Sequence, residues 1–171
     1  MKENFEDNFE DNINIFIQNT LILNNKFTLN LMKLISYPFR FIPFISILIL
    51  LFLCKAINIK QVKIIFFCEV IIVILKNTIQ RTRPCHNNNN NIIQYDYNID
   101  NYSFPSGHTL NATILAYIIY KKFPQVGYNI IILPIIVGFS RVYLGVHYLS
   151  DVISAMLLGY LLCSSNWLSK Y

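Results

Sequence analysis

The sequence predicts an all-α fold, an integral-membrane helical bundle with about five transmembrane helices plus an N-terminal interfacial helix. Two observations support this class. Hydrophobic residues make up 54% of the chain and charged residues only 13%, whereas soluble domains usually hold about 45–50% and about 25%. The apolar residues also gather in runs without the polar stripe that each helix of a soluble bundle needs. A domain of 171 residues cannot hide so much apolar surface from water.

The first forty residues are more polar than the rest and divide into two parts. Residues 1–12 repeat the tetrapeptide Asn-Phe-Glu-Asp and predict a solvated acidic tail. Residues 13–40 form an amphipathic segment in which Ile, Leu and Phe are mixed with Asn and Lys. This mixture is too polar to cross a bilayer, so it predicts a helix that lies in the membrane interface. Pro38 and Pro43 mark the break that follows.

Residues 41–171 predict the membrane-embedded domain. Its five apolar runs are Phe41–Cys54, Ile64–Leu75, Thr109–Tyr120, Val126–Phe139 and Tyr148–Leu162. Each is shorter than the ~18 residues usually required of a spanning helix, but half-polar ends can extend each to about 20 residues. Pro134 is expected to kink the fourth helix. Small residues spaced by four, such as Ala155 and Gly159, predict close helix packing.

Polar residues gather at the ends of these runs in three clusters. The clusters are Lys76 to Arg83-Pro84, then Pro105-Ser106-Gly107-His108, and finally Ser140-Arg141 with His147 and Asp151. Counting the crossings places all three clusters on one face of the membrane. Polar side chains at membrane depth are costly and usually functional. The three clusters therefore predict one site that is built for an anion.

Five of these residues suit a phosphate. Lys76, Arg83 and Arg141 can surround it with charge-assisted hydrogen bonds. Ser106 and Gly107 open a helix whose free N–H groups favour an anion, and the glycine lets the backbone approach closely. Taken singly, such cations usually anchor a helix end and such a serine usually caps one. Their convergence on one face favours the phosphate site.

The remaining three residues suit a reaction at phosphorus. His147 and Asp151 lie four residues apart on one helical face, so the carboxylate can hold one ring nitrogen while the other acts as nucleophile. His108 can act as the general acid for the leaving oxygen. A lone histidine is more often a satisfied core residue than a catalyst. Two histidines beside three cations favour catalysis.

The clusters resemble, without a mismatch, the three-part signature of the type 2 phosphatidic acid phosphatase superfamily. The matching segments are Lys76-x6-Arg83-Pro84, Pro105-Ser106-Gly107-His108 and Ser140-Arg141-x5-His147-x3-Asp151. The resemblance covers about residues 41–165. This superfamily comprises integral-membrane lipid phosphate phosphatases and is related to the soluble vanadium haloperoxidases. Many members have six spans, whereas this chain keeps only the interfacial stretch in place of the first.

The resemblance implies a metal-independent phosphatase without a cofactor, acting on a phosphomonoester or diphosphate. It implies that His147 is the nucleophile that forms a phosphohistidine and that Asp151 orients it. His108 would be the acid and then the base for water. The phosphate would be held by Lys76, Arg83, Ser106, Gly107 and Arg141. A lipid phosphotransferase with the same intermediate and a non-catalytic membrane scaffold are the alternatives, and the intact signature disfavours the scaffold.

The expected partners are a lipid phosphate substrate and the bilayer itself. Phosphatidate, lysophosphatidate, sphingoid-base phosphates and polyprenyl diphosphates all present a phosphate at the bilayer surface. The basic residues are scattered between apolar runs and form no basic face, which excludes nucleic acid. No feature of the sequence specifies an oligomeric state.

The charges of the connections predict an orientation for a multi-pass protein of the plasma membrane or an endomembrane. The face opposite the site carries six lysines and no acid: Lys55, Lys60, Lys63, Lys121, Lys122 and Lys170. The site face, with the proposed catalytic residues set aside, has a net charge of −2 from five cations and seven carboxylates. The positive-inside rule then turns the active site toward a lumen or the exterior. Glu69, two turns deeper than Lys76, is expected to be a packing carboxyl.

Overall fold

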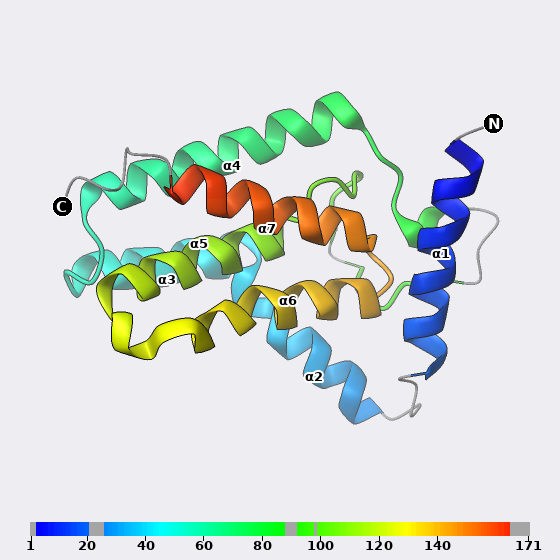
Figure 1. Ribbon diagram of the computed structural model, residues 1–171, viewed down its shortest axis with the longest axis horizontal. Helices are drawn as coiled ribbons and strands as arrows, with labels where there is room; N and C mark the ends of the chain where they lie inside the picture. The colour runs from blue at the N-terminus through cyan, green and yellow to red at the C-terminus, as the bar shows by residue number, and fades with distance from the viewer. Residues whose placement is uncertain (1–2, 21–25, 88–91, 98, 165–171) are drawn as a thin grey trace.

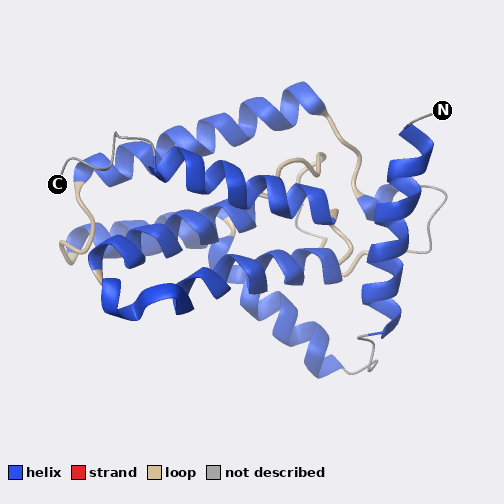
Figure 2. Ribbon diagram, viewed as in Figure 1, coloured by secondary structure: helices blue, strands red, loops and turns tan. Residues whose placement is uncertain are grey.

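Helices make up all the regular secondary structure in the described part of the chain. The computed structural model describes residues 3–20, 26–87, 92–97 and 99–164. Over these ranges the chain alternates between helices and connecting loops (Figure 2). The prediction of an all-α bundle is therefore confirmed.

Five helices form the bundle, and each corresponds to one of the predicted apolar runs (Figure 1). They are α3 (Phe41–Leu53), α4 (Ile59–Ile79), α5 (Gly107–Lys122), α6 (Ile132–Tyr143) and α7 (Leu149–Ser164). The central helix α5 packs mainly against α6 and α7, while α3 and α4 complete the bundle. The end of α4, the start of α5 and the α6–α7 turn share one end of the bundle, as the count of crossings predicts.

Cap residues set the length of α4. The Asn58 side chain accepts a hydrogen bond from the Gln61 N–H at 3.0 Å, and the Gln61 side chain accepts one from the Asn58 N–H at 2.8 Å. This reciprocal capping box starts the helix. At the other end Gln80 adopts a left-handed φ of 51° and donates its N–H to the Lys76 carbonyl. The helix therefore stops directly after the turn that carries Lys76.

The fourth apolar run differs from the predicted kinked helix. A 3-10 segment, η3 (Pro124–Ile131), comes first, and α6 begins only at Ile132. Pro134 thus lies in the first turn of α6, where a residue needs no intrahelical N–H donor. The proline starts the helix instead of bending its middle, so the prediction of a mid-helix kink is wrong.

Small residues let the bundle helices approach closely, as predicted. A Cβ atom on Gly159 would lie 3.0 Å from the Thr113 side chain of α5. A Cβ atom on Gly138 of α6 would lie 2.3 Å from a methyl group of Val152 on α7. Ala155 is fully buried in the same core. These contacts let α5, α6 and α7 pack closely, at the helices that carry the second and third polar clusters.

Two helices precede the bundle. Helix α1 (Glu3–Thr20) lies across the end of the bundle at which the three clusters meet, and α2 (Lys26–Ser36) leads through η1 (Tyr37–Phe39) into α3. The predicted boundary between an acidic tail and an interfacial segment, at residues 12 and 13, falls inside α1. Within the segment predicted as a tail, Glu10 forms an ion pair with Arg81, and Asp11 is buried.

No described helix, taken by itself, has both the length and the apolar character to cross a membrane. The stretch Lys26–Phe39 together with Phe41–Leu53 does satisfy both criteria, as a pair of helices bent by 55°.

Candidate active site

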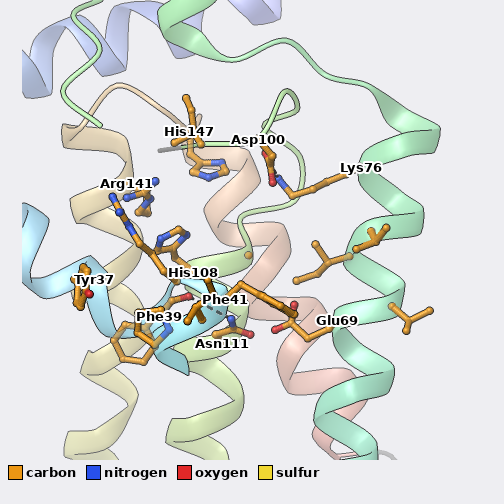
Figure 3. Close-up of a pocket in the computed structure, with 18 of the residues that line it drawn as sticks. Tyr37, Phe39, Phe41, Glu69, Lys76, Asp100, His108, Asn111, Arg141 and His147 are labelled. Carbon is orange, nitrogen blue, oxygen red and sulfur yellow. Dashed lines mark hydrogen bonds and ion pairs between the residues drawn. The ribbon is translucent and has the colours of Figure 1, made fainter. Parts of the chain in front are cut away.

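The three clusters meet around one cavity of about 850 Å³ (Figure 3). Six of the eight predicted site residues line it: Lys76, Arg83, Gly107, His108, Arg141 and His147. The other two, Ser106 and Asp151, are fully buried behind this lining. The structure thus brings all eight to one end of the bundle, in two layers.

A glycine shapes the turn that presents His147. Gly145 has a φ of +75°, a value that L side chains rarely adopt. A Cβ atom there would also lie 2.3 Å from the Ile93 carbonyl oxygen. The turn receives two further backbone hydrogen bonds, from the Cys85 N–H to the Gly145 carbonyl and from the Tyr95 N–H to the Leu144 carbonyl. The residues after both α4 and the asparagine tract therefore fix the position of the His147 backbone.

The His147 ring lies between a carboxylate and a guanidinium. Its Nδ1 is 3.4 Å from Asp151 Oδ2, and its Nε2 is 3.3 Å from an Arg83 terminal nitrogen. Because arginine can only donate, this contact assigns the lone pair to Nε2 and the ring hydrogen to Nδ1, the ring nitrogen on the side of Asp151. Burial, followed by the charge of Arg83, lowers the pKa of His147 well below its usual value. The ring is therefore neutral at neutral pH, with a nitrogen that can attack.

Lys76 and Arg83 share one carboxylate. The Lys76 ammonium donates to Asp100 Oδ1 at 3.0 Å and to the Tyr102 carbonyl at 2.8 Å. Arg83 donates to the Asp100 carbonyl at 2.8 Å, to the Val146 carbonyl at 2.6 Å, and forms an ion pair with the Asp100 carboxylate. Burial opposes the ionised form of Asp100, but the two cations hold its pKa below the usual value. The Asp100 carboxylate thus lies between the Lys76 and Arg83 cations, in a position that would suit a phosphate oxygen.

Arg141 has a similar arrangement with a second acid. It donates to Asp96 Oδ2 at 2.8 Å and to the Ser36 hydroxyl at 3.2 Å. Arg40 binds the other oxygen of Asp96 at 2.6 Å and also lines the cavity. Although burial opposes it, the two arginines lower the pKa of Asp96. Arg40, Asp96 and Asp100 were not among the predicted site residues. The available signal was the presence of two acids in the loop that joins the first two polar clusters.

The N-terminus of α5 forms another part of the wall. The Ser106 hydroxyl pairs with the Thr109 hydroxyl at 2.9 Å, so it leaves the N–H groups of the first turn uncapped. A Cβ atom on Gly107 would meet only an Ile72 methyl at 3.9 Å, so packing alone does not require a glycine. His108 Nε2 is buried and has no hydrogen-bond partner within the described residues. These groups can bind a ligand that enters the cavity.

Much of the remaining cavity lining is apolar, although Glu69 and Asn111 also belong to it. Glu69 lies below Lys76 and next to Asn111, so it forms part of the cavity wall and not only of the helix packing (Figure 3). The apolar part of the cavity lining includes Phe41, Ile42, Phe66, Val70 and Val73. A second hollow of about 250 Å³ lies between α3 and α4, and apart from Glu69 its lining is apolar. Phe41, Phe66 and Glu69 line both spaces, so a polar cavity adjoins an apolar groove.

Comparison with known proteins gives consistent matches. Residues 59–170 match the PAP2 superfamily. Phosphatidylglycerophosphatase B of Bacillus subtilis is 36% identical over an alignment of 104 positions, which covers 52% of this chain and 46% of that protein. The bacitracin transport permease protein BcrC of Bacillus licheniformis is 39% identical over 74 residues, 43% of this chain and 35% of that protein. The aligned part of the chain thus spans less than half the length of each relative.

Solved structures share the fold. A transmembrane PAP2-type phosphatidylglycerolphosphate phosphatase from Bacillus subtilis superposes with a TM-score of 0.73 at 22% identity, over 91% of this chain and 81% of its own. LpxE of Aquifex aeolicus gives 0.74 at 21% identity, over 88% and 90%. The helical bundle is therefore that of the transmembrane PAP2 phosphatases. With the match over residues 59–170 and the three clusters around one cavity, the chain belongs to the PAP2 superfamily.

Proposed function

We propose that this chain is a lipid phosphate phosphatase that hydrolyses a phosphomonoester or diphosphate of a membrane lipid. The observation that carries the proposal is the position of His147. Its Nε2, which faces Arg83, lies at the cationic end of a cavity that adjoins an apolar groove. A nucleophile beside cations suits a phosphate, and an apolar continuation suits the hydrophobic part of a lipid.

In the proposed reaction the substrate phosphate takes the place of the loop carboxylates on Lys76, Arg83 and Arg141. His147 Nε2 attacks phosphorus, a P–N bond forms and the bond to the lipid oxygen breaks. The dianionic phosphate favours a protonated His108, which gives its proton to that oxygen. Asp151 stabilises the positive charge on the His147 ring. Water, deprotonated by His108, then attacks phosphorus, breaks the P–N bond and releases inorganic phosphate.

The proposed substrate class follows from the adjoining hollow. The groove between α3 and α4 is apolar over most of its lining and shares part of its wall with the cavity of His147. Large apolar side chains on both helices, such as Leu50 and Phe67, are exposed. An acyl or prenyl chain in this groove would hold the phosphate at the cationic end. In this proposal residues 41–171 are the phosphatase domain. The segment 13–40 contributes Arg40 to the site, and the segment 1–12 contributes Glu10.

Chelation is expected to leave activity unchanged. Among the described residues, no three His, Cys, Asp or Glu side chains gather as metal ligands, and Asp96, Asp100 and Asp151 are all paired with cations. Phosphate release from phosphatidate in detergent micelles should persist in excess EDTA and should be inhibited by vanadate. Loss of activity on chelation, restored by magnesium, would contradict the proposed mechanism. Transfer to an added alcohol in preference to water would indicate the phosphotransferase.

Weakening the Asp100 contacts is expected to tighten substrate binding. Asp100→Asn removes a carboxylate that competes with phosphate for Lys76 and Arg83, and its side chain is more than half exposed. We expect KM to fall about fivefold, which corresponds to about 1 kcal/mol for such an ion pair. Asp100→Glu, which keeps the charge, serves as the matched control. Steady-state kinetics decide the question, and a rise in KM would show that Asp100 helps to bind substrate.

We further propose that the chain crosses the membrane several times, with the active site facing a lumen or the exterior. The lysine-rich turns meet at the opposite end, where Lys122 donates to the Ala56 carbonyl at 2.7 Å; Lys170 lies outside the described residues. In a chain with Cys54 and Cys85 replaced, Tyr97→Cys should be labelled by an impermeant thiol reagent only from the non-cytosolic side. Lys121→Cys should be labelled only from the cytosol. The reverse pattern would contradict this orientation.

A further inference from the structure

A cation outside the signature contacts the buried acid beside His147. We propose that Arg81, held in place by Glu10 of α1, is a positioning residue that fixes Asp151 and, through it, the His147 ring. The inference rests on the proposed function, in which His147 attacks phosphorus. Arg81 falls between Lys76 and Arg83, at a position that the signature leaves open.

The Asp151 carboxylate is held at both of its oxygens. Oδ1 accepts a hydrogen bond from Arg81 at 2.7 Å. Oδ2 accepts one from the Tyr148 N–H at 2.9 Å and is the oxygen that faces His147 Nδ1. The side chain is fully buried, so no solvent competes for these positions. The Arg81 contact therefore prevents the carboxylate from rotating away from His147.

Arg81 is itself tightly held. The nitrogen that binds Asp151 also donates to the Ser150 hydroxyl at 2.6 Å, and the guanidinium carbon lies 4.1 Å from the centre of the Tyr148 ring. Its second terminal nitrogen forms an ion pair with one oxygen of Glu10. The other oxygen of Glu10 accepts a hydrogen bond from the Ser150 N–H, in the first turn of α7, at 2.9 Å. A single carboxylate of α1 thus binds both Arg81 and the helix that carries Asp151.

Further polar side chains of α1 hold the same turn. The Asn14 amide donates to the His147 carbonyl at 3.1 Å, and the Gln18 amide donates to the Tyr143 carbonyl at 3.1 Å. Both side chains are buried. Glu10, Asn14 and Gln18 are spaced by four residues and so lie on one face of the helix. Helix α1 therefore turns a polar face toward the active-site turn.

This arrangement determines which kinetic constant should change. Arg81 is not part of the cavity lining, so it does not contact the substrate. Without Arg81, the buried Asp151 carboxylate loses its only cationic partner among the ion pairs described, and leaving such a charge unpaired is costly. The carboxylate would then reorient or take up a proton, and the His147 ring would lose its orienting partner. The rate of attack should fall while substrate affinity stays the same.

The test measures kcat and KM for Arg81→Met, Arg81→Lys and Glu10→Gln, with Lys63→Met at the opposite end of the bundle as the matched control. We expect Arg81→Met to lower kcat about 10- to 100-fold, with little change in KM. This is the size of effect seen when a residue that orients a metal-binding histidine is removed from other proteins. Arg81→Lys should recover part of kcat, because lysine keeps the charge. Glu10→Gln should lower kcat less, with the same unchanged KM.

A double-mutant cycle separates positioning from a general structural role. In an Asp151→Asn background, Arg81→Met should cause no further loss of phosphoenzyme formation, because its effect passes through Asp151. Additive losses, a raised KM or an Arg81→Met variant equal to Lys63→Met would overturn the inference. If Arg81→Met does not fold, the Arg81→Lys and Glu10→Gln cycles decide in the same way. A wild-type chain without phosphatase activity would overturn the proposed function, whereas additive losses in an active chain overturn this inference alone.

Discussion

His147→Ala is expected to abolish lipid phosphate hydrolysis, with a loss of about four to six powers of ten in kcat. The neutral His147 ring carries its lone pair on Nε2, which faces the Arg83 guanidinium in the cavity. Its removal takes away the nucleophile, and water alone would have to attack the lipid phosphate. Initial rates of phosphate release with the purified variant measure this loss.

Asp151→Asn tests the same mechanism without removing the His147 ring. The asparagine keeps the size of the side chain and leaves the His147 ring in place, but it cannot stabilise the positive ring that forms during attack. We expect a loss of about 10⁴-fold, as for other His–Asp pairs. Wild-type activity in both variants would show that the nucleophile lies elsewhere.

His108→Ala is expected to separate two kinds of substrate. The buried Nε2 of His108 lines the cavity with His147 and can protonate a leaving oxygen. A lipid alkoxide needs that proton, so hydrolysis of the lipid should fall by about 10²- to 10⁴-fold. Nitrophenolate needs little protonation, so hydrolysis of an aryl phosphate should remain measurable. Parallel assays of both substrates with one enzyme preparation test the prediction.

The contrast between the two substrates is the internal control for folding of His108→Ala. A misfolded protein would lose both activities together. If His108→Ala has the melting temperature of the wild type but loses both activities equally, the role of His108 as the acid would be contradicted.

The positions of the eight site residues could be predicted because local sequence determines them. Fixed spacings within Lys76-x6-Arg83 and His147-x3-Asp151 place each group at a helix end, and the alternation of spans brings the ends together. The hydrophobic runs likewise predict five of the helices, since apolar composition persists along each of them. Glycine at 145 shows the same principle, because a turn with a positive φ selects that residue.

The partners of these residues could not be predicted, because they come from distant segments. Asp96 and Asp100 lie in a loop beside the asparagine tract, whose residues 88–91 are outside the described ranges, and only the fold brings them to Arg141, Lys76 and Arg83.

In helix α1, composition does not indicate which face packs against the protein. Its polar residues Asn14 and Gln18 face the protein, whereas Phe9 and Phe16 are exposed. An isolated sequence gives no indication of this inverted arrangement, because the side-chain amides of Asn14 and Gln18 donate to backbone carbonyls of residues that are distant in the sequence. Periodicity predicts that a helix has two faces, but it does not identify the face that packs.

The most direct test of the account is the identity of the phosphorylated residue. Wild-type protein should be mixed with radiolabelled lipid phosphate, quenched under alkaline denaturing conditions within the first turnover, and mapped by peptide. We expect an acid-labile phosphohistidine on His147 in the wild type and, with an aryl phosphate, in His108→Ala. It should be absent from His147→Ala. A phosphohistidine that persists in His147→Ala and disappears in His108→Ala would contradict the account and reverse the two roles.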